Sequence, residues 1–263
     1  MEKSIINWIS GPVVKVSQAG KFHLNEMVEV GPEKLIGEVI ELEEDMATIQ
    51  VYEDTTGLKP GIPVSGKGLP LYVELGPGLI GTIFDGLQRP LTSLENLWGT
   101  FLQRGKGALA LDREKIWHFE PQIKKGDIVK GGEIIGVVPE THILNRYILV
   151  PPDVSGKVID AVPSGDYTIE DIIATIQNDK NNNRKALKLY HRWPIRIPRP
   201  YKNKLAPQEP LITGQRVIDV FFPLSKGGTA AIPGGFGTGK TITQHQLSKW
   251  ADADIIIYIG CGE

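Results

Sequence analysis

The amino-acid sequence predicts a multidomain protein of β and α/β units: an N-terminal β-barrel, an inserted β-rich domain, and a phosphate-loop unit at the end. Three observations lead to this fold class. Short runs that alternate apolar and polar residues open the chain, similar runs return after residue 113, and a glycine-rich loop precedes a predicted helix near the end. At 263 residues the chain is long enough for more than one domain.

Composition excludes several classes of protein. Hydrophobic residues make up 41% and charged residues 23%, which argues against wholesale disorder. A net charge of −2 gives no overall field that would attract nucleic acid or anionic lipid, so we expect no nucleic-acid partner. The one cysteine, Cys261, rules out an internal disulfide and favours a reducing compartment. We also expect no signal peptide and no transmembrane segment, because no apolar run is long enough.

Residues 1–72 are expected to form the barrel. Their β-branched runs are separated by glycine, proline and acidic turns, a pattern typical of small barrels and sandwiches. The runs cover 13–16, 26–30, 35–40 and 47–51. Residues 73–112 are expected to form a connector and the first part of the phosphate-loop unit. Within them, 79–87 is predicted to be a short helix that Pro90 stops.

Residues 113–190 are predicted to form the inserted β-rich domain, whose glycine-spaced strands resemble the hammerhead of biotinyl and lipoyl carrier domains. Such carriers place a modified lysine at a hairpin tip. This hairpin region instead offers Glu140, Thr141 and His142. A structural insert is therefore favoured over a carrier of a swinging arm.

The segment 190–204 contains five arginine and lysine residues, no acidic residue, and interleaved aromatic residues. One interpretation is a groove for single-stranded nucleic acid. The other is an extended linker, because each of its three prolines disfavours a helical conformation at the preceding residue. The slightly acidic composition of the whole chain favours the linker.

Residues 191–263 carry the strongest motif, a match to the phosphate-loop pattern G-x-x-x-x-G-K-[ST]. The loop consists of Gly234, Gly235, Phe236, Gly237, Thr238, Gly239, Lys240 and Thr241. Glycines let backbone N–H groups turn inward around phosphate oxygens. Lys240 is predicted to carry positive charge to the β- and γ-phosphates, and Thr241 is predicted to ligate Mg²⁺ through its hydroxyl.

The context of the loop also fits, because the motif requires a strand, a loop, a helix and a second strand. Residues 229–232 are predicted to be a buried strand, and 255–259 the strand after the helix. The helix is expected over 241–250, with its buried face set by Ile242, Leu247 and Trp250.

Two residues at the end of the chain have alternative interpretations. Glu263, just past a predicted parallel strand beside the loop, is placed to orient an attacking water, but a terminal glutamate is more often a solvated end. Cys261 is expected to be a packed small residue rather than a reactive thiol.

Several segments together resemble the catalytic A subunit of archaeal and bacterial A/V-type rotary ATPases, and the resemblance runs through nearly the whole chain. They are Glu-Leu-Gly-Pro-Gly at 74–78, Phe-Asp-Gly-Leu-Gln-Arg-Pro-Leu at 84–91, Ile-Thr-Gly-Gln-Arg-Val-Ile-Asp at 212–219, the phosphate loop, and Gly-Cys-Gly-Glu at 260–263. The inserted domain also fits this family.

The resemblance implies a RecA-like nucleotide-binding domain and a role for two further residues. Phe236 matches the family's loop phenylalanine, and Glu263 matches the glutamate that polarises the hydrolytic water. Gly235 departs from the proline or alanine usual at its position. The arginine expected after Glu263 is absent, as are the second acidic strand and the adenine pocket. We therefore expect an N-terminal fragment, with a truncated nucleotide-binding domain over 191–263, that is inactive alone.

For the intact assembly, the resemblance implies hydrolysis or synthesis of ATP from ADP with Mg²⁺, coupled to H⁺ or Na⁺ transport. The partners it implies are non-catalytic B subunits in an alternating ring of three A and three B subunits, central and peripheral stalk subunits, and, indirectly, a membrane sector. The complex would lie at the cytoplasmic face of a membrane. Two alternatives stay open: a hexameric RecA-like nucleic-acid translocase and a non-enzymatic assembly piece.

Overall fold

A computed structural model describes residues 4–17, 19–178 and 182–261. The chain divides into two compact units, Met1–Pro200 and Tyr201–Glu263. Within the described residues, no helix has the length and apolar character needed to cross a bilayer.

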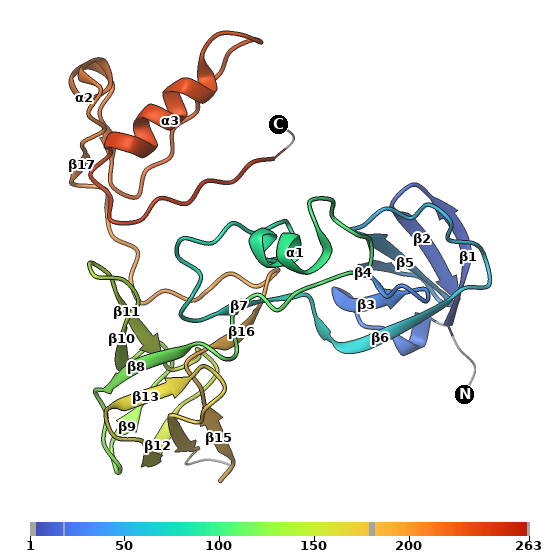
Figure 1. Ribbon diagram of the computed structural model, residues 1–263, viewed down its shortest axis with the longest axis horizontal. Coiled ribbons are helices and arrows are strands. Elements are labelled where there is room, and N and C mark those ends of the chain that lie inside the picture. The colour runs from blue at the N-terminus through green and yellow to red at the C-terminus, as the bar shows by residue number, and fades with distance from the viewer. Residues whose placement is uncertain (1–3, 18, 179–181, 262–263) are drawn as a thin grey trace. The chain divides into compact units, whose positions relative to one another are not determined.

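The first element of the larger unit is a closed barrel of six antiparallel strands in the order β1-β2-β5-β4-β3-β6 (Figure 1). The strands are β1 Ser4–Ser10, β2 Val13–Ser17, β3 Glu26–Val30, β4 Leu35–Leu42, β5 Met46–Val51 and β6 Pro63–Pro70; a short 3₁₀ turn, Ala19–Lys21, follows β2. Alternate residues point inward and form a core that includes Ile6, Val14, Val16, Val28, Val30, Leu35, Val39, Ile49 and Val51. The predicted barrel is confirmed, because the apolar positions of each alternating run fall on the inner face.

After the barrel, the chain does not form the helix that we expected over residues 79–87. Asp85 instead accepts hydrogen bonds from the backbone N–H groups of Leu87 (3.0 Å) and Arg89 (2.8 Å), which holds this stretch in a turn. Pro90 precedes the helix α1, Leu91–Trp98, with φ at −71°. A proline is tolerated at this N-cap position because a backbone N–H there has no intrahelical partner to lose. Pro90 therefore stands at the beginning of a helix, and the prediction that it ends one was wrong.

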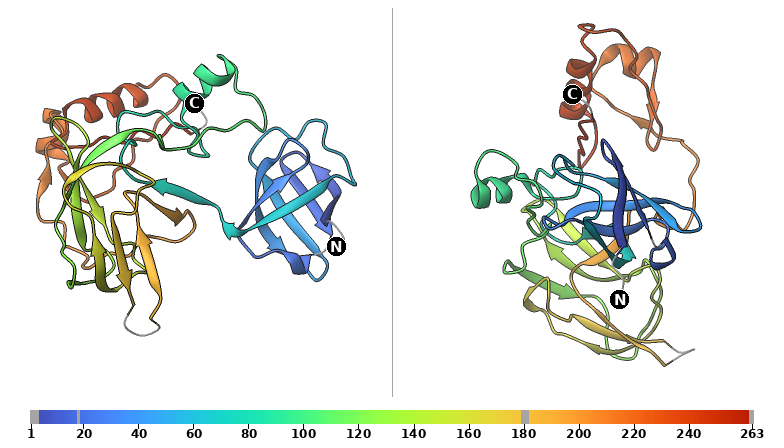
Figure 2. Two further views of the ribbon diagram at one scale, coloured as in Figure 1. Left: turned by 60° about the horizontal axis from the view of Figure 1, so that its bottom comes forward. Right: turned by 90° about the vertical axis from the view of Figure 1, so that its right-hand side faces the viewer.

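The inserted domain is a sandwich of two four-stranded antiparallel sheets (Figure 2). One sheet has the order β11-β10-β8-β13, with β8 Ile116–Pro121, β10 Ile134–Pro139, β11 Asn145–Leu149 and β13 Gly165–Thr168. The other has the order β15-β14-β12-β9, with β9 Ile128–Val129, β12 Gly156–Ala161, β14 Ala174–Gln177 and β15 Arg184–Leu187. Their shared core includes Trp117, Phe119, Ile135, Val138, Val158, Ile169, Ile173 and Ile176. The predicted β-rich insert is confirmed.

The segment after the insert runs as a linker whose arginines are engaged within the first unit. β16, His191–Pro194, pairs with β7, Tyr72–Leu75. Arg192 donates to Glu74 at 3.3 Å, and Arg199 donates to His191 Nε2 at 2.8 Å. These contacts favour the linker interpretation over a nucleic-acid groove.

Buried carboxylates tie the barrel to later segments of this unit. Glu38 of β4 has a side chain that is 0% exposed, and its two oxygens accept from Arg196 Nε (2.9 Å) and Nη2 (2.6 Å). The Tyr52 hydroxyl donates to the same carboxylate. The hydrogen bonds from Arg196, supported by the one from Tyr52, lower the pKa of Glu38 although burial opposes this shift.

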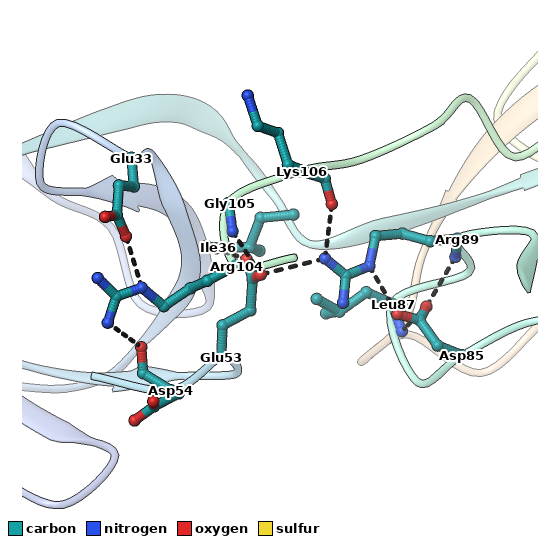
Figure 3. Close-up of polar contacts among 10 residues, drawn as sticks. All are labelled: Glu33, Ile36, Glu53, Asp54, Asp85, Leu87, Arg89, Arg104, Gly105 and Lys106. Atoms are coloured by element: carbon teal, nitrogen blue, oxygen red, sulfur yellow. Dashed lines mark hydrogen bonds and ion pairs between the residues drawn. The ribbon is translucent and has the colours of Figure 1, made fainter. Parts of the chain in front are cut away.

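A second group of polar contacts joins the barrel to the loops around α1 (Figure 3). Arg89 donates to Asp85 at 2.6 Å and to Glu53 at 3.1 Å. Glu53 also accepts from the backbone N–H of Gly105 at 2.9 Å. Arg104 donates to Glu33 at 2.5 Å. The contacts of Glu53 and Glu33 join the barrel to groups outside it. The contact between Arg89 and Asp85 lies within the turn that follows the barrel.

The smaller unit contains a two-stranded hairpin and two helices. The elements are β17 Pro210–Leu211, α2 Arg216–Phe221, β18 Leu224–Ser225 and α3 Lys240–Trp250. Asp219 of α2 accepts from the backbone N–H (2.9 Å) and hydroxyl (2.7 Å) of Thr213, which fixes the turn before the helix. Asp219 therefore stabilises local structure.

Two strands that we expected in this unit are not formed. Residues 229–232 and 255–259 adopt no regular structure, and Ile257 and Ile259 are 80% and 81% exposed. The helix α3 forms as predicted, but Ile242 and Trp250, which we expected on its buried face, are exposed. Parallel strands need neighbours that supply hydrogen bonds and cover both faces. Within residues 201–261 the hairpin of β17 and β18 supplies neither.

We predict that Glu38→Gln lowers the free energy of unfolding of the barrel by about 2 kcal/mol at neutral pH, because hydrogen bonds to a charged group are lost. The folded-state pKa of Glu38 is depressed, so its stabilisation is present above the ordinary value of 4.5 and is lost as the pH falls through the folded-state value. The difference between the wild-type protein and Glu38→Gln should therefore shrink in acid. Urea unfolding, with amide hydrogen exchange in β4 as the local probe, measures it.

The matched control is Glu44→Gln, which removes an exposed carboxylate from the β4–β5 turn. It should leave stability nearly unchanged. Equal losses for Glu38→Gln and Glu44→Gln would contradict a specific role for the buried carboxylate.

Candidate functional site

The phosphate-loop residues 234–241 lead directly into the N-terminus of α3. Gly239 is the N-cap residue, with φ at 82°, and Gly237 has φ at 77°. Both values lie in the left-handed region, which glycine adopts without steric cost. In the described chain no side chain caps α3, so the N–H groups of its first turn face outward without a side-chain acceptor. Such a helix start favours an anion.

Side chains of the loop fold back onto its backbone. Lys240 Nζ donates to the carbonyl oxygen of Gly234 at 2.5 Å, which places the ammonium group across the loop. The Thr238 hydroxyl donates to the carbonyl of Gly235 at 2.9 Å, and the Thr243 hydroxyl donates to that of Gly239 at 3.1 Å. The Thr241 hydroxyl makes no hydrogen bond within the described residues. Lys240 and Thr241 thus lie at the same end of the helix. The Lys240 ammonium group is bound to a carbonyl oxygen, and the Thr241 hydroxyl can bind a ligand.

The glycines of the loop serve different purposes. A Cβ atom at Gly234 would lie 2.5 Å from the Thr238 hydroxyl, so this position requires glycine for close approach. Gly237 and Gly239 have open space around them and require glycine for their positive φ. Gly235 has open space and no positive φ, so a side chain fits there. Phe236 is fully exposed at the tip of the loop.

Of the two residues at the chain end that the sequence singled out, the structure describes only Cys261. Glu263 lies outside the described residues. Cys261 is exposed, so the expectation of a packed residue was wrong; the run before it belongs to no sheet and offers no core to pack against. Among the described residues, no group of three or more His, Cys, Asp or Glu side chains gathers as a metal site.

Sequence reasoning missed two residues that shape this unit. Thr243 anchors its hydroxyl on Gly239 and so supports the first turn of α3. Thr213 supplies two hydrogen bonds to Asp219, and these lower the pKa of that carboxyl. The separation of six positions between Thr213 and Asp219 exceeds the span of a turn motif, so no local signal marked this pair.

Three family models match successive parts of the chain. They are the beta-barrel domain of the ATP synthase alpha/beta family over 6–68, the ATP synthase alpha/beta subunit barrel-sandwich domain over 108–196, and the nucleotide-binding domain of the same family over 214–263.

Known proteins resemble the chain over almost all of its length. It is 56% identical over 255 residues to the A-type ATP synthase A subunit of Thermococcus sibiricus, a match that covers 97% of this chain and 43% of that protein. It is 54% identical over 262 residues to the V-type ATP synthase alpha chain of Halothermothrix orenii, at 100% and 44% coverage. The chain therefore spans less than half the length of these relatives.

A solved structure has a similar fold. It is the assembled ATPase EscN from the type III secretion system of enteropathogenic E. coli, with a TM-score of 0.51 and 18% sequence identity. The match covers 97% of this chain and 40% of that one. At this identity the likeness concerns the fold alone.

We predict that Gly239→Ala disturbs the start of α3, while Gly235→Ala does not. Both positions have open space for a methyl group, but only Gly239 has a positive φ, and a left-handed conformation costs an alanine about 1–2 kcal/mol. Amide hydrogen exchange in the first turn of α3 should be faster in Gly239→Ala. Equal exchange in the two variants would show that the backbone conformation at residue 239 is not a constraint.

Proposed function

The chain belongs to the ATP synthase alpha/beta family, and we propose that it binds ATP or ADP as part of the catalytic A subunit of an A/V-type rotary ATPase. The observation that carries this proposal is the phosphate loop at the uncapped N-terminus of α3. The family match over residues 214–263 and the similarity to A-type and V-type subunits support it.

The loop would hold the nucleotide through its phosphates. Backbone N–H groups at the left-handed Gly237 and Gly239 and in the first turn of α3 would donate to phosphate oxygens. Lys240 would exchange its hydrogen bond with the Gly234 carbonyl for one with the β- and γ-phosphates. There it would stabilise negative charge that develops on the transferred phosphoryl group.

The residues at the start of α3 fit a magnesium ion that accompanies the nucleotide. Thr241 has a hydroxyl with no hydrogen bond in the described chain, and hydroxyl oxygens are among the ligands that hard cations accept. Thr241 would hold the ion beside the phosphates. When bound, Mg²⁺ neutralises charge on the phosphate oxygens.

The proposed reaction requires groups beyond the described residues. Glu263 would orient the water that attacks the γ-phosphate. An arginine from a neighbouring non-catalytic B subunit would complete the site in an alternating ring of three A and three B subunits. Closure around ATP would turn a central stalk against a peripheral stalk and so drive H⁺ or Na⁺ through a membrane sector. The complex would be peripheral at the cytoplasmic face.

We predict that Lys240→Ala weakens binding of ATP to the 263-residue chain about tenfold or more, because charge-assisted hydrogen bonds to phosphate are lost. Fluorescence anisotropy of a labelled ATP analogue with magnesium present measures this affinity. Lys249→Ala is the matched control, since Lys249 lies in the last turn of the same helix and stacks on Trp250. Equal affinities in the two variants would favour a non-enzymatic assembly role for the chain.

Thr241→Ala should abolish the gain in ATP affinity that magnesium provides, while Thr241→Ser should keep it, because serine retains the hydroxyl. The same anisotropy titration, run with MgCl₂ and with EDTA, gives this gain for each variant. If Thr241→Ala responds to magnesium as the wild-type chain does, the assignment of the hydroxyl as a metal ligand is wrong.

A further inference from the structure

The inserted domain has a basic cleft on the outer face of one of its sheets. The cleft encloses about 610 Å³ and is lined by Lys125, Lys157 and Arg184, together with Ile159 and Gln177. All three basic residues are exposed. The cleft lies in the inserted domain and uses no residue of the phosphate loop.

Strand register brings the cationic residues onto one face. Lys157 of β12 pairs with Gln177 of β14, which pairs with Arg184 of β15. On its other side Lys157 pairs with Ile128 of β9, whose side chain is 70% exposed. Residues paired across neighbouring strands share a face of the sheet, and neighbouring strands lie about 4.8 Å apart. Arg184, Gln177, Lys157 and Ile128 therefore form one row across the sheet, with Lys125 beside it.

Three other basic residues of this domain have acidic partners, whereas the described residues supply none to those of the cleft. Arg113 is 2.6 Å from Glu74, Arg146 is 2.6 Å from Glu140, and Lys188 pairs with Glu170. Across the described part of the chain, no carboxylate lies within ion-pair distance of Lys125, Lys157 or Arg184, and none lines the cleft. The positive charges of these three residues repel one another, and no negative charge of the described chain offsets them. An acidic partner would reduce this repulsion, so the cleft favours one.

We propose that this basic cleft docks an acidic segment of a partner protein. Carboxylates of the segment would pair with Lys125, Lys157 and Arg184, and an aliphatic side chain would cover Ile128. The mixture of cations with an exposed isoleucine fits such a peptide. It fits single-stranded nucleic acid poorly, because no aromatic ring lines the cleft to stack on bases.

The experiment uses a fluorescein-labelled peptide of repeated Glu-Leu-Glu-Glu units and the 263-residue chain at low ionic strength. We expect a measurable anisotropy change that weakens with added salt. The double variant Lys157→Glu, Arg184→Glu should lose about tenfold or more in affinity, since two favourable contacts become repulsive. Lys157→Gln only removes a charge, so it should lose less affinity for the peptide. This variant keeps the test valid if the double variant fails to fold.

The matched control is Lys185→Glu, which changes the same charge on β15 one residue further along. Lys185 pairs with the buried Ile176, so it lies on the opposite face from Arg184. It should bind the peptide as the wild-type chain does. A loss of affinity in Lys185→Glu as large as that in the double variant, or no binding of the peptide at low salt, would overturn the proposal. The proposal would also be wrong if the chain failed to bind the peptide but bound oligothymidine or phosphatidylserine vesicles through Lys157 and Arg184.

Discussion

The larger unit depends on carboxylates that the barrel buries and cannot satisfy alone. Glu38 is fully buried, and a buried charge without a partner is strongly destabilising. Its partner, Arg196, lies 158 residues further along the chain, after the whole inserted domain. Arg89 satisfies the buried Glu53 in the same way, and Arg104 pairs with the exposed Glu33. The barrel therefore determines the path of the segments that follow it.

In the smaller unit, the corresponding constraint is the backbone of the phosphate loop. Gly237 and Gly239 have positive φ, and α3 begins there without a capping side chain. Both features depend only on residues close to one another in the sequence. The loop and α3 accordingly form, while the apolar run 255–259, which requires neighbouring strands, stays exposed.

This division explains what could be predicted from the sequence. Alternating patterns predicted the strands of the barrel and the insert, and motif spacing predicted the loop and helix, because each of these patterns lies in residues close in sequence. The region 79–91 was predicted wrongly, because a proline can either end or begin a helix and the side chain of Asp85 decided between them. The pairing of Glu38 with Arg196 could not be predicted, since no local pattern connects residues so far apart.

The proposal that this chain contributes part of the hydrolytic site of a rotary ATPase is tested most directly by Glu263→Gln. The variant would be placed in a chain of the relatives' full length and assembled with non-catalytic B subunits. ATP turnover should fall about a hundredfold or more, because a positioned base is lost, while ATP remains bound. Turnover equal to that of the wild-type assembly would contradict the claim.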